Sequence, residues 1–158
     1  MSFRITGLEA APFAHLFGLS DGALARHNAR RYVADAKPGF PCRITLEDAE
    51  PGETLLLVPH AHQTSATAYA SKGPIFIRER TAKCAAWHDE IPEQLKVRLI
   101  SLRAYAADGM MLDADVVEGR ELKPLIERFL ANESVSYLHA HFARRGCYAA
   151  LIERSPAS

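Results

Sequence analysis

The chain has 158 residues, a length at which one folded domain buries roughly 70% of the surface that its unfolded chain exposes. Hydrophobic residues make up 48% and charged residues 24%, the proportions of a globular domain rather than of a disordered or repetitive chain. Nineteen basic and nineteen acidic side chains give zero formal charge, so no overall field attracts nucleic acid. We therefore expect a single domain over residues 1–158, with no nucleic-acid partner.

Neither a membrane segment nor a disulfide framework can be recognised. The longest apolar run, residues 55–58, is far shorter than the roughly 20 residues that a spanning helix needs, and the start does not resemble a secretory signal. The three cysteines, Cys42, Cys84 and Cys147, are odd in number and far apart, with no C-x-x-C motif. We expect reduced thiols in a cytoplasmic protein without a membrane partner.

The first half of the chain predicts a short strand, a helix and a hairpin. Ser20 can cap a helix that ends before Lys37-Pro38-Gly39, and Glu50-Pro51-Gly52-Glu53 is typical of a turn. Residues 59–73 are rich in Ser, Thr, Ala and His without periodicity, which predicts a loop. The expected elements are an extended start at residues 3–8, a helix at 23–32, paired strands at 42–46 and 54–58, the loop, and a strand at 75–78.

The second half predicts two hairpins that flank an amphipathic helix. Asp108-Gly109 supplies the positive φ angles of a type I′ turn, and Gly146 can take the left-handed position of a bulged turn. Pro124 is tolerable only in the first turn of the helix. Helical spacing i, i+3, i+4, i+7 and i+8 joins the apolar residues Leu122, Leu125, Ile126, Phe129 and Leu130. The expected elements are strands at 97–106 and 110–117, the helix at 120–131, and strands at 135–142 and 147–153.

Short turns rather than helical crossovers join the consecutive strands. Such connections favour antiparallel pairing, and an amphipathic helix must bury its apolar face against another layer. The predicted fold class is α+β, a mostly antiparallel sheet of hairpins with two principal packed helices.

Five short motifs carry a family resemblance, namely Pro41-Cys42-Arg43, Pro51-Gly52-Glu53, Gly73-Pro74-Ile75-Phe76, Leu102-Arg103-Ala104-Tyr105 and Gly146-Cys147. In this order they resemble the bacterial family called domain of unknown function 1203, over about residues 3–154. The resemblance implies no activity, substrate or cofactor, so no catalytic residue is carried over. It implies a histidine before the Gly-Cys turn, which His139 matches, whereas His60 and His62 lie outside the family pattern.

Two His-x-His pairs could bind a metal ion. His60-Ala61-His62 lies in the predicted loop, and His139-Ala140-His141 lies on a predicted strand. Residues i and i+2 of a strand point to one face, so each pair could offer two imidazoles to one divalent ion. On the second pair's strand, we expect Leu138, Ala140 and Phe142 to face the core and the histidines to face outward. Polar residues on a sheet face are the alternative interpretation, which we favour.

Cysteine and arginine side chains suggest a second kind of site. Cys147 follows a tight turn across the hairpin from His139, and a thiol near an imidazole can become a nucleophile. Cys84 and His88 are four residues apart, but a cysteine beside Ala and Trp is more often a small buried residue. Arg43 and Arg103 lie within apolar segments, where a guanidinium can bind an anionic ligand or form a structural ion pair.

For both arginines we favour the ion pair, with acceptors among Glu47, Glu53 and Asp113. The basic clusters of Arg26, Arg30 and Arg31 and of Arg144 and Arg145 are typical of a solvated face.

Three functional hypotheses of different classes follow. The leading one is a small ligand-binding domain or enzyme whose pocket lies at one end of the sheet near Cys42, Arg43, Arg103, His139 and Cys147. The second is a divalent-metal protein that uses His60, His62, His139 and His141. The third is a non-catalytic module that forms a homodimer through an exposed sheet edge or face. The sequence identifies no cofactor.

Overall fold

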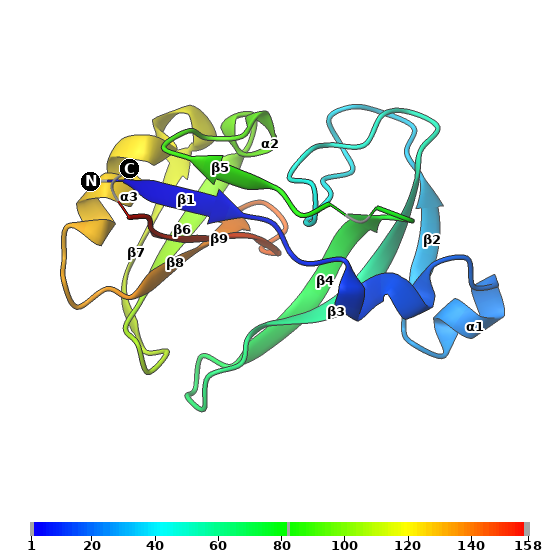
Figure 1. Ribbon diagram of the computed structural model, residues 1–158, viewed down its shortest axis with the longest axis horizontal. Helices are drawn as coiled ribbons and strands as arrows, with labels where there is room; N and C mark the ends of the chain where they lie inside the picture. Colours follow the sequence, from blue (N-terminus) through cyan, green and yellow to red (C-terminus); the bar gives the residue numbers. More distant parts are fainter. Residues whose placement is uncertain (1, 82, 157–158) are drawn as a thin grey trace.

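The computed structural model describes residues 2–81 and 83–156, which form two antiparallel sheets side by side (Figure 1). Within these residues the larger sheet has six strands, in the order β5-β1-β9-β8-β6-β7. Their bounds are β1 Phe3–Thr6, β5 Ala86–His88, β6 Leu99–Tyr105, β7 Met111–Glu118, β8 Tyr137–Phe142 and β9 Tyr148–Arg154. Both ends of the described chain therefore lie in this sheet, where β1 pairs with β9.

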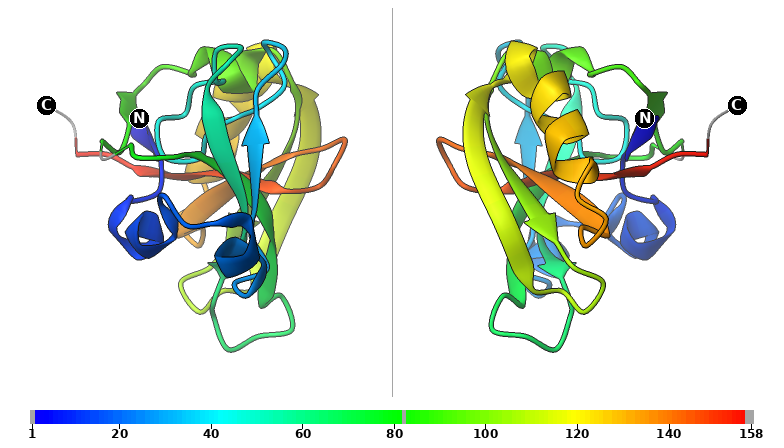
Figure 2. Two further views of the ribbon diagram at one scale, coloured as in Figure 1. Left: turned by 90° about the vertical axis from the view of Figure 1, so that its right-hand side faces the viewer. Right: turned by 90° about the vertical axis from the view of Figure 1, so that its left-hand side faces the viewer.

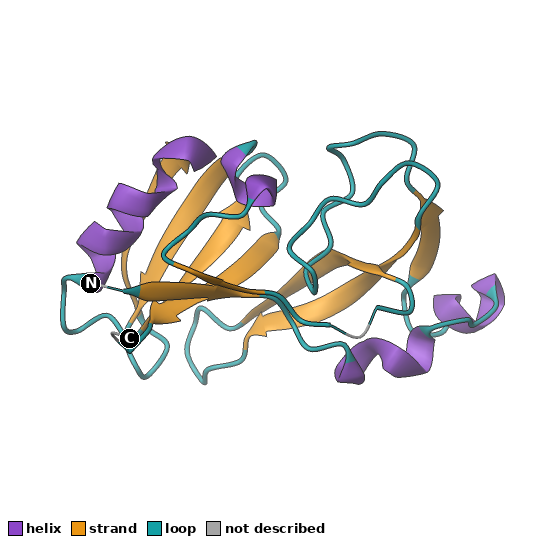
Figure 3. Ribbon diagram, turned by 45° about the horizontal axis from the view of Figure 1, so that its top comes forward, coloured by secondary structure: helices purple, strands orange, loops and turns teal. Residues whose placement is uncertain are grey.

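The smaller sheet contains β2 (Arg30–Val33), β3 (Thr54–Gln63) and β4 (Ser71–Arg78), in the order β2-β3-β4. A 3₁₀ helix (Ala11–Leu16) and the short α1 (Asp21–Ala25) lie at its outer side (Figure 3). Phe13, Leu16 and Leu24 from these helices pack with strand residues Leu56, Val58, Ile75 and Ile77. The smaller sheet thus has a core of its own on that side.

Helix α3 (Leu122–Leu130) covers the outer face of the larger sheet, and Figure 2 shows it across that face. Its five apolar residues are all buried, as the spacing predicted. They pack against Ile100, Leu102 and Ala104 of β6 and against residues of β8 and β9. A second helix on this side, α2 (Glu93–Lys96), is only four residues long. None of the helices in residues 2–81 and 83–156 has the length and apolar character that a bilayer span requires.

Both predicted C-terminal hairpins are confirmed, but the type I′ turn expected at Asp108-Gly109 is not, because only Gly109 and not Asp108 has a positive φ. β6 pairs with β7 across Asp108-Gly109, where Gly109 has φ +88°, and β8 pairs with β9 across a turn that holds Gly146 at φ +82°. A side chain at either glycine would be strained in this left-handed conformation. All pairs of named strands are antiparallel, so the α+β class of mostly antiparallel hairpins is confirmed.

Three predictions in the first half were wrong. The helix expected at 23–32 ends at Ala25, because Asn28 takes a left-handed conformation and residues 30–33 pair with β3. The strand expected at 42–46 is a tight turn, in which the Cys42 carbonyl accepts a hydrogen bond from the Leu46 N–H. The loop expected at 59–73 is confined to residues 64–70, since β3 runs to Gln63 and β4 begins at Ser71. His60 and His62 therefore lie on β3.

Candidate functional site

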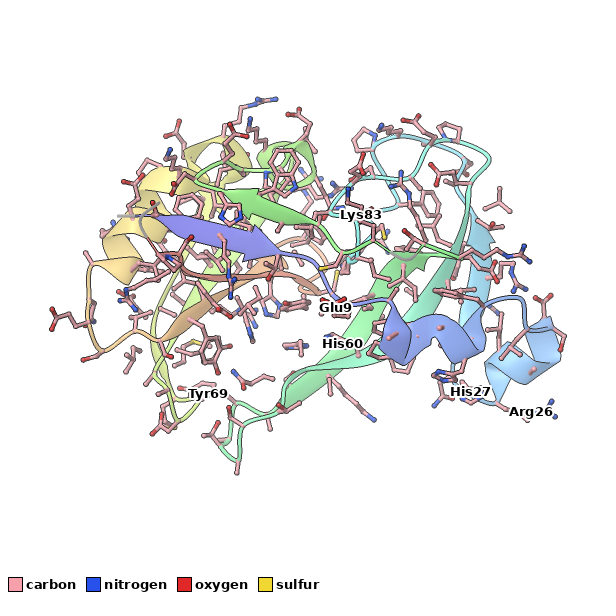
Figure 4. The ribbon with its side chains drawn as sticks, in the orientation of Figure 1. Glu9, Arg26, His27, His60, Tyr69 and Lys83 are labelled. Atoms are coloured by element: carbon pink, nitrogen blue, oxygen red, sulfur yellow. The ribbon has the colours of Figure 1, made fainter. Side chains whose placement is uncertain are left out.

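The two sheets meet at the face of β8 that carries His139 and His141. Strand β3 covers this face, and Figure 4 shows His60 directed from β3 into the space between the sheets. His139 is only 5% exposed and His141 only 1%. The predicted alternation is confirmed, since Leu138, Ala140 and Phe142 join the core on the other face. The histidines are nevertheless not exposed to solvent, because a sheet that is distant in sequence packs over them.

The imidazoles and one tyrosine form a buried aromatic cluster. Ring centroids of His62 lie 4.9 Å from His141 and 6.2 Å from His139, and His139 and His141 are 6.3 Å apart. Tyr148 of β9 stacks on His62 with centroids 5.5 Å apart and an interplanar angle of 14°. The structure thus brings together one histidine of the first His-x-His pair and both of the second.

The hydrogen bonds of His141 define its tautomer. Its Nδ1 lies 3.0 Å from the carbonyl oxygen of Gly146, which can only accept, so Nδ1 carries the proton and donates it. Its Nε2 lies 3.5 Å from Nη1 of Arg103, which can only donate. His141 is therefore a neutral imidazole whose two nitrogens both have partners, and a proton added at Nε2 would face the Arg103 charge.

Burial disfavours the charged form of every imidazole in the cluster. Desolvation lowers the pKa of His139 to about 3 and that of His141 to about 4, with neighbouring imidazoles and Arg103 as smaller causes. The pKa values of His60 and His62 are also lowered, again mainly by burial.

The metal hypothesis finds part of its ligand set assembled. His62 and His139 each have a buried Nδ1 without a hydrogen-bond partner, but His141 uses both nitrogens and His60 instead lies against Phe13 and Tyr148. Across the part of the chain that the structure describes, no group of three or more His, Cys, Asp or Glu residues is arranged to hold a metal ion. A metal would need Arg103 and at least one imidazole to move.

The Arg43 guanidinium donates a hydrogen bond to the thiol of Cys147. The Arg43 side chain is almost fully buried, at 1% exposure, and its Nη2 lies 3.1 Å from Sγ of Cys147. Its Nε donates to the Tyr148 carbonyl at 2.8 Å and its Nη1 to the Pro41 carbonyl at 2.7 Å. The guanidinium also lies over the ring of Phe142, 4.8 Å from the centroid.

The ion pairs expected for Arg43 and Arg103 do not form. Among the described residues, neither arginine has a carboxylate partner, and it is Arg78 that pairs with Glu47 and Glu53. Burial lowers the pKa of the Arg43 guanidinium to about 10, whereas the Cys147 sulfur acts in the opposite direction. The Cys147 thiol is thus the side chain that comes closest to serving as a counterion for the buried Arg43 cation.

Cys147 lies in the wall of a pocket of about 220 Å³ between the sheets. Strand β4 and the β8–β9 turn form the pocket, together with Arg103 from β6. Its lining residues are His62, Ser71, Lys72, Gly73, Pro74, Arg103, His141, Arg145, Gly146, Cys147 and Tyr148. Three of these are cationic and, as far as the described residues go, none is acidic. We call Lys72, Arg103, Arg145 and Cys147 the basic thiol pocket.

Some of the predicted site residues meet here and others do not. Cys147 and Arg103 line the pocket, and Arg43 lies behind Cys147. His139 lies deeper, against Tyr105 and Tyr137, so the neighbouring His141 takes its place. Lys72 was missed because it was assigned to a loop, whereas Arg145 was part of a basic cluster interpreted as a solvated face.

Cys42 and Cys84 have other surroundings. Cys42 is fully buried, and its Sγ accepts a hydrogen bond from the Arg78 N–H at 3.2 Å, so it does not reach the pocket. The Cys84 thiol donates to the Gly7 carbonyl at 3.0 Å, and burial raises the pKa of this thiol. Cys84 precedes β5, which contains His88, so the two lie on extended chain rather than on a helical turn.

All three cysteines are free thiols, as the sequence predicted. A titration of denatured, unreduced protein with an aromatic disulfide reagent should therefore detect three equivalents of thiol per chain. A result of one equivalent would show a disulfide and contradict this arrangement.

The comparisons with known proteins agree with the motifs. The model of a family described as "Protein of unknown function (DUF1203)" matches residues 39–154, well over half of the 158-residue chain. This segment contains every residue of the basic thiol pocket, as well as Arg43. No curated protein and no solved structure matches the chain. By the extent of the family match, the chain belongs to the DUF1203 family.

Proposed function

We propose that this protein binds a small anionic ligand in the basic thiol pocket, where Cys147 is the nucleophilic side chain. The observation that carries the proposal is the contact of 3.1 Å between Cys147 Sγ and the buried guanidinium of Arg43. It is a more specific form of the leading sequence hypothesis, with Lys72, Arg145 and His141 added and His139 and Cys42 removed.

A buried guanidinium requires hydrogen-bond acceptors and a compensating charge. Two backbone carbonyls satisfy Nε and Nη1 of Arg43, but they carry no net charge. A thiolate at Cys147 would supply that charge at the position where the third nitrogen points. The thiolate is the nucleophilic form of cysteine, and reactive cysteines are found in electropositive, partly exposed surroundings. Cys147 meets both conditions, being half-buried in a wall that carries three cations.

The cations of the pocket are suited to an anionic group. In the described residues, Lys72, Arg103 and Arg145 have no carboxylate partner, so their charges are available to a ligand. Arg103 is held by its contacts with Ser101 Oγ and His141 Nε2. We assign His141 as a positioning residue, because its nitrogens are both used and its imidazole orients Arg103 rather than accepting a proton from Cys147.

The proposal can be tested with two alkylating agents that differ in charge. Iodoacetate and iodoacetamide react in the same way: the thiolate sulfur forms a bond to the CH₂ carbon and iodide leaves. At pH 7, the ratio of the iodoacetate rate to the iodoacetamide rate at Cys147 should exceed that of a small free thiol by roughly tenfold. Such a factor corresponds to about 1.4 kcal/mol, within the range of a charge pair near a protein surface.

Charge-neutralising variants provide the controls. K72Q combined with R145Q should bring the ratio down toward that of the free thiol, whereas R144Q should leave it unchanged, since Arg144 is exposed and does not line the pocket. Mass spectrometry would identify the alkylated cysteine. A ratio at Cys147 equal to that of the free thiol would refute an anion-binding pocket, and a rate with both reagents below that of the free thiol would refute a reactive thiolate.

A further inference from the structure

An exposed apolar strip lies beside the basic thiol pocket, on the edge strand β7. It consists of Leu112, Ala114 and Val116, and we call it the β7 strip. Leu112 is 45% exposed and Val116 is 52% exposed, which makes them two of the most exposed large apolar side chains among the described residues. Exposed apolar area of this kind is characteristic of a binding surface when it adjoins polar groups.

Strand register places the β7 strip next to the cations. Ala114 is paired with Arg103, and Val116 is paired with Ser101, whose Oγ lies 3.4 Å from Nε of Arg103. Residues directly opposite each other on antiparallel strands share a face, with Cβ atoms about 5 Å apart. Ala114 and Val116 therefore continue the pocket along the same face of the larger sheet, and Leu112 lies at the β-bulge between Asp113 and Met111.

The loop between β3 and β4 contacts the β6–β7 turn, where Thr67 Oγ1 lies 3.4 Å from the Gly109 carbonyl oxygen, and Val116 stays exposed beyond it. Helix α3 packs on the opposite side of the sheet, where Arg128 reaches Asp115 and Val117 joins the core. In the smaller sheet, β4 is the edge strand on the side of the pocket, and its residues line the pocket. Among the described residues, none of β7 lines the pocket, so the β7 strip lies next to the pocket rather than inside it.

The free edge of β7 is not suited to another strand. The Asp113 carboxylate accepts a hydrogen bond from the Ala114 N–H, and the Asp115 carboxylate accepts one from the Val116 N–H, each at 2.8 Å. These backbone donors are thereby occupied, and the two acidic side chains repel a second copy of the same edge. This argues against dimerisation through the β7 edge.

We propose that the ligand is an anionic amphiphile whose charged group is bound by Lys72, Arg103 and Arg145 and whose apolar chain lies on the β7 strip. The inference rests on the proposed function, because it uses the same pocket for the anionic group. Cations in a pocket and an apolar strip on the adjoining strand match the two ends of such a molecule.

The test compares ethyl phosphate with octyl phosphate, each titrated by calorimetry below its aggregation concentration. Each methylene that the strip covers should tighten binding roughly fourfold. Partial coverage of the six additional methylenes should therefore make octyl phosphate bind at least about tenfold more tightly. In the double variant L112S/V116S this gain should fall to less than about threefold, while ethyl phosphate should bind as before.

The matched control is V33S, because Val33 is exposed to 59% but lies on β2. In V33S, octyl phosphate should still bind about tenfold more tightly than ethyl phosphate. If ethyl phosphate does not bind, the proposed function fails. If it binds but octyl phosphate shows no gain, or the gain survives L112S/V116S, only the amphiphile inference is overturned. A concentration-dependent dimer that L112S/V116S abolishes would also overturn it, because a second copy would then cover the strip.

Discussion

Replacing Arg43 by alanine is expected to lower the free energy of unfolding by about 3–5 kcal/mol, the largest effect of any single substitution that we predict. The variant R43A removes the donors that satisfy the Tyr148 and Pro41 carbonyls, and it leaves a cavity beneath the Phe142 ring. Each buried carbonyl without a donor costs about 1–3 kcal/mol, and the lost packing adds to this. Urea unfolding followed by circular dichroism measures the change.

Two further variants separate the causes. R43M keeps most of the side-chain volume but none of the donors, so it should lose less stability than R43A while also slowing the alkylation of Cys147. R144A removes an exposed arginine from the same region and should stay within about 0.5 kcal/mol of the original protein. If R43A lost less than about 1 kcal/mol, the guanidinium would not be the buried structural group that we describe.

Stability is expected to fall by about 3–4 kcal/mol between pH 7.5 and pH 5, because His139 and His141 are buried as neutral imidazoles. An unfolded histidine has a pKa near 6.5, whereas burial lowers the folded pKa values to about 3 and about 4. Below pH 6.5 the unfolded chain therefore binds more protons than the folded chain. Stability is fully present above about pH 7 and declines as the pH falls through 6.5 toward 4.

Urea unfolding at a series of pH values measures this slope. The range above pH 5 avoids the carboxylates of Glu53 and Glu79, whose pKa values are lowered by hydrogen bonds and lie below it. H139F should make the slope clearly shallower, and H88N, at an exposed histidine, should leave it unchanged. A stability that does not vary between pH 5 and pH 7.5 would contradict the buried, neutral state of both imidazoles.

Local sequence signals predicted the second half of the fold well. The Asp108-Gly109 turn and the helical spacing from Leu122 to Leu130 each depend on residues that are close in sequence. Positive φ angles and an amphipathic face favour one local conformation almost regardless of the rest of the chain. The first half carried weaker signals, since Pro59 and two histidines interrupt the alternation of β3 and so hide a strand.

Some residues of the site could also be predicted from the sequence. Cys147 and Arg103 were chosen because a thiol at a tight turn and a charge within an apolar strand are unusual in themselves. His139 was chosen because it lies across the hairpin from Cys147 on the face opposite the core, but strand β3 buries it and leaves His141 at the pocket. Because β3 and β8 are far apart in sequence, no local pattern indicates that one covers the other.

By itself, the sequence determined the family, the antiparallel α+β class, the C-terminal hairpins with their helix, and two of the pocket residues. Only the tertiary structure decided that His139 and His141 are buried and neutral, that Arg43 has a thiol as its partner, and that Lys72 and Arg145 face the same space. Arg43 and Cys147 are separated by 104 positions along the chain. Contacts between residues so far apart in sequence form only when complete sheets pack together. A buried charge is then stable only where this packing places hydrogen-bond acceptors beside it.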